Sequence, residues 1–173
     1  NFFFIAIIDS TRPKIFENYQ ISYEKFSESV STLYSIVIYI SLMFCIGVTL
    51  FASVIIYIIY GHEYSSAVQP LRLVVWYTTF SYIGSVRNIW ILAVNQQKWL
   101  WVINVSGALA NVILNLIFIP SFGVSGAAAA SLLTQIFSNI IVSYLIKGTR
   151  ENTYIMIKGM DVRLIIRLFK RVK

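Results

Sequence analysis

Long apolar runs separated by short polar connections dominate the chain. A helix rises about 1.5 Å per residue, and the hydrocarbon core of a membrane is about 30 Å thick. Four runs are each long enough to cross that core, and they cover residues 33–60, 71–94, 99–119 and 124–146. The pattern therefore predicts an all-α protein, a polytopic transmembrane helical bundle with four full spans.

A very short connection joins the third and fourth runs. Pro120 cannot continue a helix, and Gly123 and Gly126 loosen the backbone just after it. Two full-length apolar helices joined in this way are expected to form a transmembrane hairpin, because their backbone polar groups must be satisfied within the membrane. At the other end of the first run, Gly61 is a good helix stop.

The segments outside the runs complete the predicted organisation. The apolar start NFFFIAII is too short to span and lacks the basic flank of a signal peptide, so residues 1–9 are expected to be the tail of an upstream transmembrane helix. Residues 10–32, with mixed charges around Pro13, are expected to be a cytoplasmic connection with a helical lead-in. Residues 148–173 are expected to be a basic cytoplasmic tail, either a cationic amphipathic helix on anionic lipid or a frayed end.

Composition and charge favour the same class. Charged residues make up 12% of the chain, whereas a soluble domain has about 25%. The net charge of +7 is concentrated in the last third and on one side of the predicted membrane, which indicates a cytoplasmic C-terminus and excludes a nucleic-acid partner. The predicted location is a plasma membrane, crossed several times.

The residues offer little for catalysis or metal binding. Cys45 is the single cysteine and His62 the single histidine, so neither a disulfide framework nor a metal cluster is expected. The outward connections contain no acid-base pair or activated nucleophile. We therefore expect no enzyme activity, no cofactor and no metal.

Polar residues inside the spans carry the functional hypothesis, because each must find a partner or a cavity at membrane depth. The predicted substrate-path residues are Arg87, Asn88, Asn104, Asn111 and Asn115, and a small polar stripe on the last span contains Ser131, Thr134 and Ser138. Close helix packing would use the same residues. For Arg87 the alternatives are snorkelling to the headgroups, a structural pair, or a water-filled cavity where it meets a phosphate oxygen.

The stretch NVILNLIFIPSFGVSGAAAASLLTQ resembles the Wzx-type O-antigen and polysaccharide repeat-unit flippases, a family of the multidrug/oligosaccharidyl-lipid/polysaccharide exporter superfamily. In that family paired asparagines precede Ile-Pro, a short glycine-containing turn and Gly-Ala-Ala. The resemblance extends over about Tyr23 to Lys147, and NQQK at Asn95–Lys98 departs from it where relatives often have a glycine.

The resemblance implies the C-terminal part of a MATE-like transporter with about twelve spans. Such proteins move undecaprenyl-diphosphate-linked repeat units of O-antigen, the glycan of lipopolysaccharide, from the inner to the outer leaflet of a bacterial plasma membrane by alternating access. Partners would be the lipid-linked oligosaccharide and other polysaccharide-assembly membrane proteins. Arg87 would help to hold the diphosphate or an acidic sugar, and the four asparagines would offer amides to hydroxyls.

Two other functions compete with a flippase. A multidrug exporter of the same superfamily should carry an acidic residue within a span for ion coupling, and the four predicted spans contain none. An O-antigen polymerase or ligase should carry a long outward loop with catalytic residues, whereas the outward connections here are short.

Overall fold

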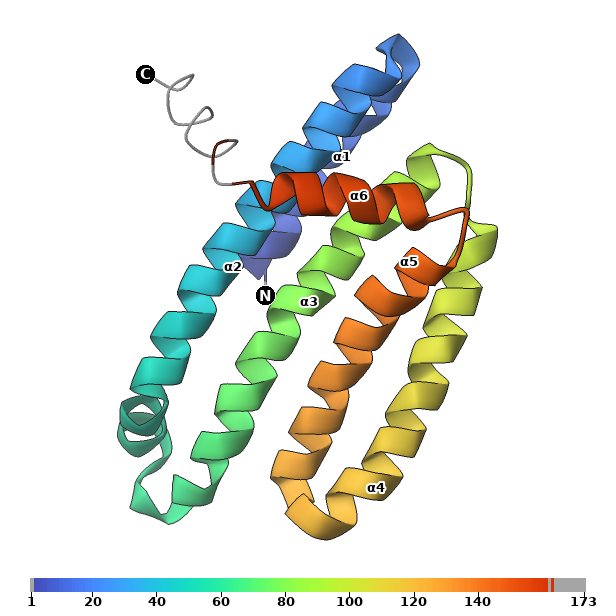
Figure 1. The fold of residues 1–173 in the computed structure, drawn as a ribbon. Helices are drawn as coiled ribbons and strands as arrows, with labels where there is room; N and C mark the ends of the chain where they lie inside the picture. The colour runs from blue at the N-terminus through green and yellow to red at the C-terminus, as the bar shows by residue number, and fades with distance from the viewer. Residues whose placement is uncertain (1, 162, 164–173) are drawn as a thin grey trace, which may run out of the picture.

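The computed structural model describes residues 2–161 and residue 163, and every regular element in that part of the chain is a helix. Figure 1 shows long helices running up and down side by side, with one short helix crossing them near one end. The elements are α1 (Phe2–Ile21), α2 (Tyr23–Tyr60), the 3-10 helix η1 (His62–Ala67), α3 (Val68–Ala93), α4 (Lys98–Ile136), the π-helix η2 (Phe137–Val142), α5 (Ser143–Leu145) and α6 (Arg150–Gly159). The predicted all-α class is confirmed.

Two helical stretches are long and apolar enough to cross a membrane. They are Tyr23–Tyr60, with 38 residues, and Lys98–Leu145, with 48 residues. Both expose large apolar side chains, including Leu50 and Ile58 on the first and Leu109 and Leu116 on the second. A soluble protein seldom exposes so much contiguous apolar surface, so these two helices favour association with a membrane.

A helical reversal lies inside α4, where the sequence predicts the chain to turn. The chain reverses at Gly123, whose φ of 54° and ψ of −132° interrupt the helical backbone. Beyond the reversal, Gly126 packs directly on the carbonyl oxygen of Phe118. Asn111 on the first arm also donates to Thr134 on the second. The two arms therefore lie antiparallel and in contact, as Figure 1 shows for the yellow and orange segments.

The start of the chain differs from the expected boundary at residue 9. α1 is one helix from Phe2 to Ile21 with Pro13 inside it, and α2 begins at Tyr23 after the N-cap residue Ser22. Residues 10–32 are thus almost entirely helical. The reason is tertiary packing, since Ile8 and Ile15 are buried in the core on either side of Pro13 and stabilise the helix through it. The predicted end of the next helix at Gly61 is confirmed.

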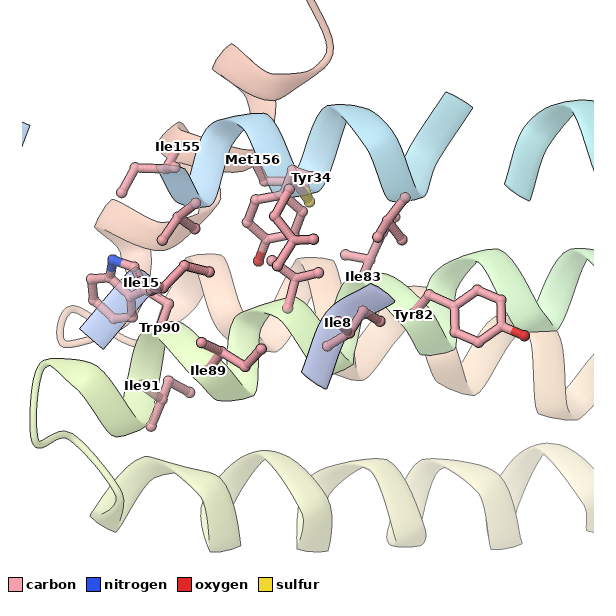
Figure 2. Packing of buried hydrophobic residues seen from close by; sticks show 14 of the residues in the cluster. Ile8, Ile15, Tyr34, Tyr82, Ile83, Ile89, Trp90, Ile91, Ile155 and Met156 are labelled. Atoms are coloured by element: carbon pink, nitrogen blue, oxygen red, sulfur yellow. The ribbon is translucent and has the colours of Figure 1, made fainter. Parts of the chain in front are cut away.

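The hydrophobic core lies where α1, α2, α3 and α6 meet. Figure 2 shows Ile15, Tyr34, Trp90 and Met156 contributed to this cluster by four different helices. The fully buried Tyr34 donates its hydroxyl hydrogen to Asn152 of α6 at 3.0 Å. The short helix α6 is therefore part of the folded core.

Polar contacts fix the C-terminal end of α6 along α2. Ser35 donates to the carbonyl oxygen of Gly159 at 2.5 Å, and Tyr39 donates to that of Met160 at 2.7 Å. The predicted tail of residues 148–173 thus contains a docked helix over Arg150–Gly159. The cationic amphipathic helix expected near the end of this tail falls, apart from Arg163, on residues 164–173, which lie outside the described residues.

Candidate functional site

A polar cavity of about 380 Å³ lies between α3, the two arms of α4, and η2. Amide, hydroxyl and small side chains make up most of its wall. The lining residues are Tyr77, Ile103, Asn104, Gly107, Ala108, Asn111, Ser131, Thr134, Gln135, Ser138 and Asn139. The lining contains no charged side chain, so the cavity offers hydrogen bonds without a formal charge.

Two of the predicted asparagines lie in this wall, and a third supports it. Asn104 and Asn111 line the cavity. Asn115 donates its Nδ2 hydrogen to Asn111 Oδ1 at 2.9 Å, and Asn111 Nδ2 donates to Thr134 Oγ1 at 3.2 Å. The bond to Thr134 ties the two arms of the hairpin together. These asparagines therefore serve helix packing and cavity lining at the same time.

The predicted stripe on the second arm faces the same space. Ser131, Thr134 and Ser138 all line the cavity. Thr134 and Ser138 donate back to the carbonyl oxygens of Ala130 and Thr134 within their own helix. Such back-bonding satisfies the hydroxyl donor within its own helix and leaves its lone pairs available as acceptors.

Arg87 lies behind the cavity wall, and its side chain is buried with only 3% of its surface exposed. Its Nη1 donates to Asn139 Oδ1 at 2.8 Å and to Ser143 Oγ at 3.3 Å, and its Nη2 donates to Asn88 Oδ1 at 2.9 Å. All these partners are neutral. Arg87 and Asn88 are absent from the cavity lining, so the structure places these two predicted site residues beside the cavity.

Two residues that the sequence reasoning left out are central to the site. Asn139 and Gln135 line the cavity, and Asn139 joins it to Arg87. Their signal was present, because positions 135, 138 and 139 continue the face that Ser131 and Thr134 begin. The sequence reasoning considered only small side chains on this face and therefore missed the larger amides of Gln135 and Asn139.

The backbone is irregular where Asn139 enters the site. Asn139 lies in the π-helix Phe137–Val142, and such one-turn π segments often occur at functional sites. Across from it, a side-chain carbon on Gly84 would come within 2.6 Å of Asn139 Oδ1. The lack of a side chain at position 84 therefore makes room for the Asn139 amide against α3.

The chain offers no clustered metal ligands in the part that the structure describes. Cys45 is buried, with its sulfur 3.0 Å from the Val75 carbonyl oxygen and 3.1 Å from Thr79 Oγ1. His62 packs against the ring of Tyr57. Neither residue contributes to the cavity.

No protein family, curated protein or solved structure matches this chain. The resemblance to the repeat-unit flippases stays a prediction from the residues that carry it.

Proposed function

We propose that this chain is part of a polytopic flippase that moves lipid-linked oligosaccharide repeat units, such as those of O-antigen, across the bacterial plasma membrane. The observation that carries the proposal is an uncharged, open polar cavity between helices whose other faces are apolar and exposed. In this mechanism the cavity shelters sugar hydroxyls while the lipid tails stay in the bilayer, and the protein alternates between inward and outward access.

The proposed topology has four spans within the chain. The stretch Lys98–Leu145 is 48 residues long, and its reversal at Gly123 divides it into two arms. Each arm is long enough for a separate crossing at about 1.5 Å per residue. The helix α3 has 26 residues and is also long enough to cross. In this topology α2 and α3 form one hairpin, and the two arms of α4 form the next. Residues 33–60, 71–94, 99–119 and 124–146 are the corresponding proposed spans.

The proposed orientation places the C-terminus in the cytoplasm. Basic residues gather on the side that holds Lys14, Lys25, Lys98 and the segment after Lys147. α6 packs against α2 at Tyr34 and Ser35, which is the same end of the bundle. In this arrangement the exposed side of α6 contacts anionic lipid of the inner leaflet, and the same lipid is the proposed partner of the basic tail.

The proposed roles of the site residues follow their positions. Asn104 and Asn111 offer amides to the glycan from the cavity wall, with Asn115 orienting Asn111. A direct bond between Arg87 and the diphosphate stays a prediction. In the conformation described here, the Arg87 hydrogen bonds go to protein oxygens instead. We propose no catalytic step and no cofactor.

A flipping assay with the full-length protein in liposomes tests this function. A fluorescent undecaprenyl-diphosphate oligosaccharide should reach the outer leaflet, where a membrane-impermeant quencher detects it. Ala108→Trp, which fills the cavity, is expected to slow flipping at least about tenfold, because a new indole overpacks the wall. Leu109→Trp is the matched control, since Leu109 is 61% exposed on the outer face of the same helix.

The proposal fails if the glycan lipid does not cross, or if both tryptophan variants behave like the wild type. Transport of a cationic dye without transport of the glycan lipid would identify the multidrug exporter instead.

A further inference from the structure

A chain of hydrogen bonds connects Arg87 to the cavity. The guanidinium has only donors, so the atom of Asn139 that accepts from it at 2.8 Å must be the amide oxygen. The amide nitrogen of Asn139 then faces the other way. It donates to the carbonyl oxygen of Phe80 at 2.8 Å and to Gln135 Oε1 at 2.6 Å. Arg87 thus fixes which way round the Asn139 amide sits.

The same logic extends to Gln135. Since Asn139 presents an N–H group, the atom of Gln135 that meets it must be the amide oxygen. This leaves the Nε2 group of Gln135, with its two hydrogens, for the cavity that the residue lines. Arg87 is a buried cation outside the cavity lining. Through Asn139 it determines that Gln135 presents hydrogen-bond donors to the cavity rather than an acceptor.

The absence of charged side chains from the cavity lining favours an uncharged ligand. The cavity is lined by amides, hydroxyls and the ring of Tyr77, and no lysine, arginine or acidic residue belongs to the lining. A phosphate taken from water into such a wall would lose its hydration without gaining an opposite charge, which is costly. Neutral hydroxyls both donate and accept, so they match a wall that carries both kinds of group. Aromatic rings such as that of Tyr77 can also cover the apolar face of a sugar ring.

We propose that the cavity binds an uncharged sugar ring, that Gln135 contacts it through Nε2–H donors, and that Arg87 and Asn139 are positioning residues for Gln135. This inference rests on the proposed function and deepens it. The sugars occupy this cavity, and the diphosphate lies outside it.

Sugar binding by the purified full-length protein in detergent tests the proposal, with methyl glucoside and glucose 1-phosphate as probes in saturation-transfer NMR titrations. Methyl glucoside is expected to bind at least about tenfold more tightly than the phosphate, because the phosphate has no counter-charge in the lining. Gln135→Glu keeps the oxygen that accepts from Asn139 but removes the donors. It should weaken methyl glucoside binding about tenfold through loss of a buried hydrogen bond.

Asn139→Asp separates positioning from folding. A carboxylate keeps the acceptor for Arg87 and adds an ion pair, but it has no N–H for Gln135. The Gln135 amide should therefore turn over and present its oxygen to the cavity, which weakens binding. The Tm should stay within a few degrees of wild type, because the new ion pair with Arg87 offsets the lost bond to the Phe80 carbonyl oxygen. Asn88→Asp is the matched control, because Asn88 also accepts from Arg87 but lies outside the cavity lining. It places the same charge beside the same guanidinium and should leave sugar binding unchanged.

The proposal is overturned if neither sugar binds. It is also overturned if glucose 1-phosphate binds more tightly than methyl glucoside, or if Asn88→Asp and Asn139→Asp weaken binding equally. A protein that flips the glycan lipid but fails these binding tests would remain a flippase without this recognition site. A protein that binds methyl glucoside as predicted but flips nothing would retain the site and lose the proposed function.

Discussion

Replacing Gly126 with alanine is expected to lower the free energy of unfolding by about 2–3 kcal/mol, because an added methyl group has no room between the two arms of the hairpin. In the structure a carbon at that position would collide with the carbonyl oxygen of Phe118 and would lie 3.1 Å from the Ile119 nitrogen. Backbone atoms of a helix cannot rotate away as a side chain can. The arms must therefore separate at the end where the chain reverses.

Thermal unfolding in detergent measures this effect, with Gly47→Ala as the control. Gly47 also lies within a helix, but a carbon added there meets no atom within 4 Å. Alanine at that position should raise stability by about 0.5–1 kcal/mol through its better helix propensity. Equal Tm values for the two variants would show that the arms do not meet at Gly126.

Arg87→Met is expected to destabilise the protein by about 2–4 kcal/mol, because amide oxygens of Asn139 and Asn88 would be left without their donor. The cost of burying the Arg87 charge opposes this effect. The guanidinium is buried, its Nε has no partner among the described residues, and no acidic side chain appears among its hydrogen-bond partners. Removing such a charge can be neutral or favourable when apolar atoms replace it. We expect the loss to dominate because Asn139 is itself buried and its amide oxygen would lose the short bond that Arg87 now donates.

The Tm of Arg87→Met, measured beside Arg87→Lys, checks this balance. Lysine keeps the charge and part of the donor set but cannot reach several oxygens in a fixed fork, so an intermediate Tm is expected. A methionine variant as stable as the wild type would mean that the cost of burying the guanidinium equals the value of its bonds.

The sequence predicted those turns and helix ends that depend on the backbone limits of single proline and glycine residues. The reversal after Pro120 and the helix end at Gly61 are both present, because proline and positive-φ glycine limit the backbone whatever packs around them. Pro13 also indicated a break in the helix, but α1 continues through it because Ile8 and Ile15 anchor the helix on both sides. Packing of this kind cannot be read from one segment alone.

The site was predictable in part for a similar reason. Asn104 and Asn111 are seven residues apart, a spacing that places them on one face of a helix, and both line the cavity. The environment of Arg87 was not predictable, because its partners Asn139 and Ser143 lie more than fifty positions away in the chain. Asn139 also depends on the irregular turn of η2, which shifts side chains relative to ordinary helical spacing.

Cysteine accessibility at two neighbouring positions tests most directly whether a wet cavity lies inside a membrane-embedded bundle. Ala108 lines the cavity and Leu109 faces outward, so the two positions differ in surroundings at nearly the same depth. In a Cys45→Ser background and in permeabilised membranes, Ala108→Cys should react readily with a charged thiol reagent. Leu109→Cys should react at least about tenfold more slowly, because its thiol cannot ionise among acyl chains. Equal reactivity at both positions, or an inert cysteine at position 108, would contradict the account.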